Sequence, residues 1–139
     1  MLDEGAGAAR PSVILLIEDD PDSRAELRAL LEDEGHTVLE ACDGRRGLVL
    51  ASLHQPDMII QDLLLPDSPG FELVAELRRL PGGASLPILA LSGFPERLTE
   101  AQAWALGFSR FLRKPPEVSE LCATVQGLLR ARPVGDAGG

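Results

Sequence analysis

Five short apolar runs alternate along the chain with longer stretches in which apolar residues recur at helical spacing. Runs of this length are too short for buried helices, and they suit strands covered on both faces, as in a parallel sheet. The second run is more polar than the others, so we expect it to lie nearer an edge of the sheet. The predicted strands are residues 13–17, 36–41, 58–60, 87–91 and 111–112.

The amphipathic stretches between these runs predict five helices, bounded by residues that begin or end helices. Asp20 followed by Pro21 is a helix-start pair in which Asp20 caps the first turn, and Gly35 ends the same helix. The predicted helices are residues 21–34, 45–54, 70–80, about 95–107 and 116–131. Alternating strands and helices indicate an α/β fold, with a five-stranded parallel sheet and helices on both faces. We expect one domain over residues 12–131, with a disordered leader at 1–11 and a disordered tail at 132–139.

Helical periodicity also predicts which side chains face the sheet. Trp104, the single tryptophan, lies off the apolar stripe of the fourth helix. It is either partly packed at the helix end or an exposed anchor for a partner, since Trp is enriched at binding hot spots. The predicted inward positions are Leu48, Ala51 and Ser52 in the second helix, Leu98, Ala101, Ala105 and Leu106 in the fourth, and Val118, Leu121, Val125 and Leu128 in the last.

Composition and charge narrow the class of protein. The chain has 139 residues, of which 45% are apolar and 25% charged, as expected for one globular domain. A net charge of −9 argues against unaided binding to nucleic acid, which needs a basic face. Cys42 and Cys122 belong to no metal-binding spacing, so we expect two reduced, partly buried thiols. The sequence has neither a membrane span nor a secretory signal, and this predicts a cytoplasmic protein.

Polar residues that could bind a ligand or take part in a reaction follow four of the five predicted strands. Glu18 and Asp19 end the first, Asp62 ends the third, Ser92 the fourth and Lys114 the fifth. The carboxyl ends of parallel strands share one edge of the sheet, where ligands bind in open α/β folds. Three neighbouring carboxylates favour Mg²⁺, while a lysine supplies a counter-charge and a serine a hydrogen bond to an anion.

Asp62 is the centre of this predicted site. A loop aspartate can merely cap a strand, and that interpretation is the simpler one for the stretch by itself. With its neighbours considered, Asp62 fits a carboxylate that becomes phosphorylated, because aspartate is an established nucleophile for aspartyl-phosphate formation. Mg²⁺ and a lysine would neutralise the transferring group, which is most of what phosphoryl transfer requires of a protein.

From Val13 to Arg130 the sequence resembles the receiver domain of bacterial two-component response regulators, of the stand-alone chemotaxis type. The resemblance rests on motifs that occur in the family's order and at its spacing. These are the acidic pair Glu18-Asp19, Asp62 with Pro66 four and Gly70 eight residues later, Ser92, and Lys114-Pro115.

The resemblance implies a flavodoxin-like (βα)5 fold with strand order 2-1-3-4-5. It implies that Asp62 accepts a phosphoryl group from a histidine kinase or a histidine phosphotransfer protein. Lys114 and Ser92 would bind the phosphoryl oxygens. Mg²⁺ would be held by Glu18, Asp19, Asp62 and the backbone carbonyl of Leu64.

The resemblance also implies a switch made of Ser92 and Phe111, where Phe replaces the more frequent Tyr. Phosphorylation would repack the face formed by the helix at about 95–107, the strand at 111–112 and the helix at 116–131. That face would meet an output protein, or a second copy in a homodimer. Direct nucleic-acid binding, membrane association and enzymatic activity beyond assisting its own phosphorylation and dephosphorylation are not expected.

Two other functions compete with this interpretation. A phosphatase with an aspartate nucleophile needs a second aspartate two residues later, where this sequence has Leu64. A phosphorylation-independent binding module with a receiver-like fold would not need all five site positions filled, as they are here. The sequence leaves open whether the chain is complete or a part of a larger regulator or hybrid kinase.

Overall fold

The computed structural model describes residues 12–63, 65–67, 70–93 and 99–131. Its five parallel strands form one sheet in the order β3-β2-β4-β5-β6, which confirms the predicted order 2-1-3-4-5 and the edge position of the second strand. The leader and tail predicted for residues 1–11 and 132–139 lie outside the described residues. The strands are β2 (Val13–Ile17), β3 (Thr37–Ala41), β4 (Met58–Asp62), β5 (Ile88–Ser92) and β6 (Arg110–Arg113).

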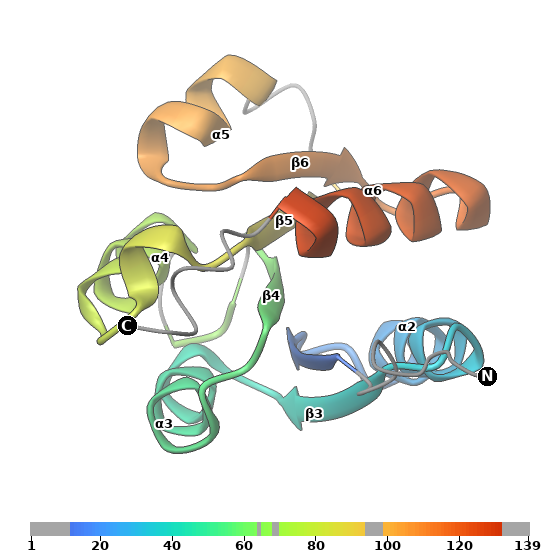
Figure 1. The fold of residues 1–139 in the computed structure, drawn as a ribbon, viewed down its shortest axis with the longest axis horizontal. Helices are drawn as coiled ribbons and strands as arrows, with labels where there is room; N and C mark the ends of the chain where they lie inside the picture. The colour runs from blue at the N-terminus through green and yellow to red at the C-terminus, as the bar shows by residue number, and fades with distance from the viewer. Residues whose placement is uncertain (1–11, 64, 68–69, 94–98, 132–139) are drawn as a thin grey trace, which may run out of the picture.

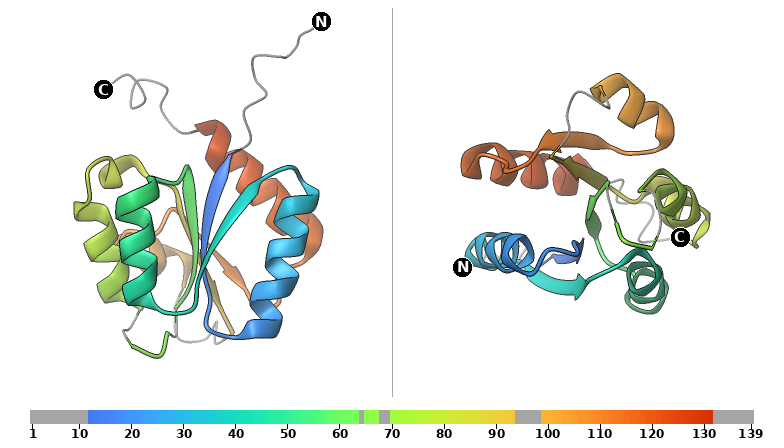
Figure 2. Two further views of the ribbon diagram at one scale, coloured as in Figure 1. Left: turned by 90° about the horizontal axis from the view of Figure 1, so that it is seen from below. Right: turned by 180° about the vertical axis from the view of Figure 1, so that it is seen from behind.

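Helices cover both faces of this sheet (Figures 1 and 2). α2 and α6 pack on one face, and α3, α4 and α5 pack on the other. A short 3₁₀ helix, η1 (Gly83–Ser85), follows α4. The helices are α2 (Pro21–Asp33), α3 (Gly44–His54), α4 (Gly70–Arg79), α5 (Glu100–Leu106) and α6 (Val118–Ala131).

The sheet separates the apolar core into two clusters because successive side chains of a strand point to opposite faces. In β2, Leu15 and Ile17 belong to the cluster under α3, α4 and α5, whereas Ile14 and Leu16 belong to the cluster under α2 and α6. β2, β4 and β5 are almost completely buried, as expected for the inner strands of a parallel sheet. Two buried faces therefore fix the register of the strands, and with it the position of each strand end.

The helix-start pair is confirmed, because Asp20 is the N-cap of α2 and its side chain accepts a hydrogen bond of 2.8 Å from the Ser23 amide. The expected start of the fourth helix near Pro95 lies outside the described residues, and within them α5 begins at Glu100. Its N-cap is Thr99, which forms a capping box with Gln102.

Several predicted inward positions are wrong. In α3, Ser52 is exposed. In α5, Ala101, Ala105 and Leu106 are exposed and only Ala103 is buried, while Leu98 lies outside the described residues. Val118 is 51% exposed at the start of α6, where Thr124 joins Leu121 and Val125 as a buried residue. In α3, Gly44, Gly47 and Ala51 are buried, and the predicted inward residue Leu48 is partly buried against the core.

Trp104 is 74% exposed, so the exposed-anchor interpretation agrees with the structure and the packed one does not. Both cysteines are free thiols of intermediate exposure, as predicted. Within the described part of the chain, no helix has the length and apolar character needed to cross a membrane.

Gly47 permits the close approach of α3 to β2. A Cβ atom at this position would lie 2.4 Å from Cδ1 and 2.9 Å from Cγ1 of Ile17, which is fully buried. We therefore expect Gly47→Ala to lower the free energy of unfolding by about 1–3 kcal/mol through overpacking. The matched control is Gly127→Ala in α6, where a Cβ would meet nothing within 4 Å.

The control should raise the free energy of unfolding by up to about 1 kcal/mol, because alanine has the higher helix propensity. Urea unfolding of both variants measures the difference. Equal stability of the two variants would show that α3 can move away from the sheet without cost.

Candidate functional site

The strand register gathers the predicted site residues at the carboxyl edge of the sheet. Ile17 pairs with Gln61, which places Glu18 beside Asp62 at the ends of β2 and β4. Ser92, the last residue of β5, pairs with Arg113, so Lys114 follows directly after β6. The Lys114 amide donates a 2.8 Å hydrogen bond to the Ser92 carbonyl.

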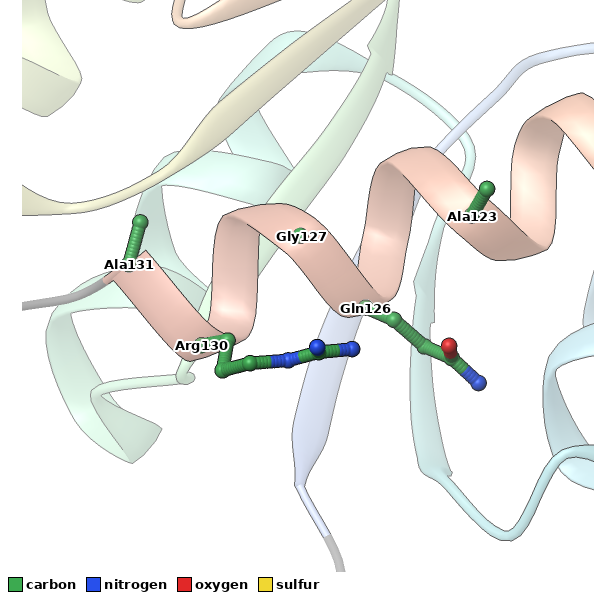
Figure 3. A pocket seen from close by; sticks show the side chains of 5 residues that line it. All are labelled: Ala123, Gln126, Gly127, Arg130 and Ala131. Carbon is green, nitrogen blue, oxygen red and sulfur yellow. The ribbon is translucent and has the colours of Figure 1, made fainter.

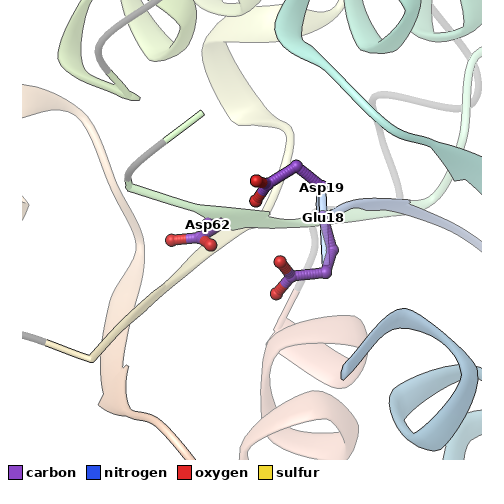
Figure 4. Close-up of side chains that lie close together, drawn as sticks. All are labelled: Glu18, Asp19 and Asp62. Atoms are coloured by element: carbon purple, nitrogen blue, oxygen red, sulfur yellow. The ribbon is translucent and has the colours of Figure 1, made fainter. Parts of the chain in front are cut away.

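Three carboxylates meet at this edge (Figure 4). One oxygen from each of Glu18, Asp19 and Asp62 lies within 4.8 Å of the others. Glu18 is 1% exposed and Asp62 is 8% exposed, while Asp19 faces solvent. Carboxylates this close repel one another unless a positive charge lies among them, and their oxygens are the ligands that Mg²⁺ prefers. The donor set therefore fits a hard divalent cation.

The Lys114 ammonium supplies part of the positive charge that this cluster needs. Its Nζ donates to Glu18 Oε1 at 2.5 Å and to Asp62 Oδ2 at 3.1 Å. Burial tends to lower the pKa of Lys114, but the hydrogen bond to Glu18 and the charge of Asp62 outweigh burial and raise it. The pKa of Glu18 is also raised, because burial of its carboxylate outweighs the hydrogen bond from Lys114.

Backbone contacts fix the Glu18 carboxylate in place. Its second oxygen, Oε2, accepts a 3.0 Å hydrogen bond from the Asp20 amide. Its backbone carbonyl accepts a 2.8 Å hydrogen bond from Nη1 of Arg24, a residue of α2. Arg24 also forms a 2.9 Å ion pair with Glu40 of β3. The end of β2 is therefore held by the helix that follows it and by the neighbouring strand.

The remaining predicted site residues are Ser92, Phe111 and Leu64. Ser92 is 3% exposed at the end of β5. Phe111 is half-buried in β6, pairs with Ala90 and packs against the core cluster under α3, α4 and α5. Leu64, whose carbonyl the resemblance assigns to Mg²⁺, lies outside the described residues.

Asp67 is a residue near the site to which the sequence analysis gave no role. Its two carboxylate oxygens accept hydrogen bonds from the amides of Gly44, at 2.8 Å, and Arg45, at 2.9 Å, at the start of α3. An aspartate in a Pro/Gly-rich loop is a recognisable capping residue, but ordinary caps act on the following helix. Here the capped first turn lies more than twenty residues before Asp67 in the chain, and no local signal indicates that.

A separate shallow depression lies along α6 (Figure 3). Three of its five lining residues are glycine or alanine, and none belongs to the carboxylate cluster. It offers few groups that could bind or transform a ligand, so the candidate chemistry remains at the strand ends. The lining residues are Ala123, Gln126, Gly127, Arg130 and Ala131.

Comparison with known families agrees with this geometry. The sequence profile of the response regulator receiver domain matches residues 14–126. The chain belongs to the response regulator receiver family. As a member of that family it is a phosphoacceptor signalling domain of two-component systems, and the phosphorylation-independent alternative is not favoured.

The relatives of this receiver domain include a protein of similar length and a longer regulator. It is 38% identical over 120 residues to an uncharacterized 14.6 kDa protein of Leptolyngbya boryana, covering 86% of this chain and 92% of the relative. It is 38% identical over 117 residues to the DNA-binding dual master transcriptional regulator RpaA of Synechocystis, covering 84% of this chain. The chain spans 48% of that regulator's length.

Solved receiver structures share the fold. The receiver domain of sensor histidine kinase PA1611 from Pseudomonas aeruginosa PAO1 has a TM-score of 0.81 and 27% identity, covering 88% of this chain and all of that one. That structure has a magnesium ion coordinated in its active site cleft. The acidic cluster of the present receiver domain is of the kind that can hold such an ion.

The contacts of Lys114 predict how this receiver domain responds to loss of the ammonium. Lys114→Met keeps the aliphatic length but leaves Glu18 and Asp62 without their shared counter-charge. We expect the free energy of unfolding at neutral pH, in the presence of a chelator, to fall by about 1–3 kcal/mol. In an Asp62→Asn background the same substitution should cost less, because only one of the two bonded carboxylates remains.

A double-mutant cycle of Lys114→Met and Asp62→Asn, followed by urea unfolding, measures this difference. Additive losses would mean that Lys114 and Asp62 do not interact energetically in the folded protein.

Proposed function

We propose that Asp62 is the phosphoacceptor of this domain. The contact that carries the proposal is the Lys114 ammonium, 3.1 Å from Oδ2 of Asp62 within a cluster of three carboxylates. A carboxylate oxygen of Asp62 would attack the phosphorus of a phosphohistidine. The O–P bond forms as the N–P bond breaks, and the histidine nitrogen keeps the electron pair and takes up a proton.

Mg²⁺ is the proposed cofactor, with Glu18, Asp19 and Asp62 as its carboxylate ligands. When bound, the ion neutralises negative charge that the phosphoryl oxygens bring to the cluster. Lys114 would then turn part of its hydrogen bonding from Asp62 to a phosphoryl oxygen, and Ser92 would donate a hydrogen bond to another. Apart from assisting its own phosphorylation and dephosphorylation, the domain is proposed to have no enzymatic activity.

We propose a histidine kinase or a histidine phosphotransfer protein as the phosphodonor. The proposed output surface is formed by α5, β6 and α6, with Ser92 and Phe111 as the switch residues. Trp104 and Val118 are exposed apolar residues of its two helices, at 74% and 51%. The occupant of this surface would be an output protein or a second copy of the chain, without direct contact to nucleic acid. A cytoplasmic location stays a prediction.

The proposed chemistry predicts phosphorylation at a single carboxylate. Acetyl phosphate with Mg²⁺ should add one phosphoryl group to the wild-type protein, and mass spectrometry of peptides should place it on Asp62. Asp62→Asn should remain unmodified, whereas Asp22→Asn, which changes an exposed aspartate of α2, should be phosphorylated like wild type. Beryllofluoride with Mg²⁺ should change the Trp104 fluorescence of the wild type and of Asp22→Asn, but not of Asp62→Asn.

Modification of Asp62→Asn at the wild-type level would refute Asp62 as the acceptor. A wild-type protein that neither takes up phosphate nor responds to beryllofluoride would support the phosphorylation-independent binding module instead.

The exposed position of Trp104 predicts that its role lies outside folding and chemistry. Trp104→Ala should change the free energy of unfolding by less than about 0.5 kcal/mol, as for surface substitutions in general. It should also leave the rate of phosphorylation by acetyl phosphate unchanged. Urea unfolding followed by circular dichroism and a phosphorylation time course measure both effects. A loss of stability above about 1 kcal/mol would show that the indole packs against the fold and is no free anchor.

A further inference from the structure

Asp67 joins two parts of the chain that the strand order does not join. It lies five residues after Asp62, in the loop between β4 and α4. Its Oδ1 accepts a 2.8 Å hydrogen bond from the Gly44 amide, and its Oδ2 accepts a 2.9 Å hydrogen bond from the Arg45 amide. Both carboxylate oxygens are therefore engaged by the first turn of α3.

These hydrogen bonds complete a cap that α3 already possesses in part. The first amides of a helix have no partner within the helix. Asp43, the N-cap of α3, accepts from the Arg46 amide, at 2.8 Å. Gly44 and Arg45 receive their acceptor from Asp67. The start of α3 thus has two aspartates with separate tasks: Asp43 closes its own turn, and Asp67 connects that turn to the loop after β4.

The charge of Asp67 suits this place. The hydrogen bond from the Gly44 amide, and next the one from Arg45, lower the pKa of Asp67, so its carboxylate stays ionised under ordinary conditions. A negative charge is also favoured at a helix N-terminus by the helix dipole. The connection is therefore charge-assisted at two points, and a side chain with one acceptor oxygen could not reproduce it.

Three described residues of the loop after Asp62 are held by contacts outside it. The Leu63 amide donates a 3.0 Å hydrogen bond to the Leu91 carbonyl of β5, and Leu63 is 5% exposed. Leu65 is part of the core cluster under α3, α4 and α5. Asp67 is bound to the start of α3. Each of these residues is therefore anchored to another part of the fold.

Resting on the Mg²⁺ site of the proposed function, we propose that Asp67 is a positioning residue for the bound cation. Its carboxylate fixes the loop that follows Asp62 against the start of α3, and in this way it holds the cluster of Glu18, Asp19 and Asp62 in a geometry that binds a divalent ion. Mg²⁺ demands near-ideal ligand geometry, so a loosened loop lowers its affinity. Groups outside the coordination shell that orient a ligand commonly change metal affinity by about 10–100-fold.

The test compares two aspartates at the same helix end. Asp67→Asn keeps the shape but retains one acceptor oxygen, and Asp67→Ala removes both. Asp43→Ala is the matched control, because it weakens the cap of α3 without touching the loop after Asp62. Titration of each protein with MgCl₂, followed by isothermal calorimetry, should give a Kd about tenfold or more higher than wild type for Asp67→Ala and an intermediate Kd for Asp67→Asn. Asp43→Ala should stay within about twofold of wild type.

Amide hydrogen exchange without Mg²⁺ provides a second measurement. Loss of protection at Gly44 and Arg45 is expected in Asp67→Ala, and at Arg46 in Asp43→Ala. A wild-type Kd in Asp67→Ala despite lost protection would overturn the proposal, and so would equal weakening in Asp43→Ala, which would indicate a general loss of helix stability. Absence of Mg²⁺ binding by the wild-type protein would instead refute the proposed function. This outcome is seen in the wild-type titration alone, so it is distinguishable from failure of the proposal on Asp67.

Discussion

The ammonium of Lys114 between two buried carboxylates is the interaction on which the site depends. Strand geometry forces Glu18 and Asp62 together at the sheet edge, and neither can reach enough solvent to screen its charge. Lys114 contacts both. Three carboxylates against one ammonium still leave a formal charge of −2 at the site. The cluster is thus partly neutralised when empty of ligands, and its remaining charge complements a divalent cation.

This balance also ties the site to strands that carry no carboxylate. Lys114 follows β6, whereas Asp62 ends β4, so the ammonium reaches past the intervening β5 and its terminal Ser92. The same lysine bonds through its backbone amide to the Ser92 carbonyl. A new hydrogen-bond acceptor near Asp62 therefore competes for the Lys114 ammonium, and the backbone of this same lysine is hydrogen-bonded to the end of β5. Local charge at Asp62 and the arrangement of those two strands are consequently linked through one residue.

The sequence predicted the sheet and the residues at its edge because both follow from strong periodicity and from the shared direction of parallel strands. It failed where a short or terminal stretch departs from the periodic pattern. α5 has only seven residues and buries Ala103 alone, and Val118 at the first position of α6 faces solvent. The capping box at Thr99 is recognisable in the sequence. The hydrogen bonds from the start of α3 to Asp67, in contrast, depend on tertiary structure that no local sequence pattern contains.

The two ends of α5 are attached to the fold in different ways. At the C-terminal end, half-buried Arg78 of α4 donates to the Gly107 carbonyl from Nε at 2.9 Å and from Nη2 at 2.5 Å, and to the Gly83 carbonyl at 2.8 Å. At the N-terminal end, Glu100 pairs with Arg110 of β6 in an ion pair that is exposed on both sides. Exposed pairs contribute at most about 1 kcal/mol, whereas a buried guanidinium that loses its acceptors leaves an unpaired charge. The C-terminal end of α5 is therefore attached more firmly to the fold than its N-terminal end.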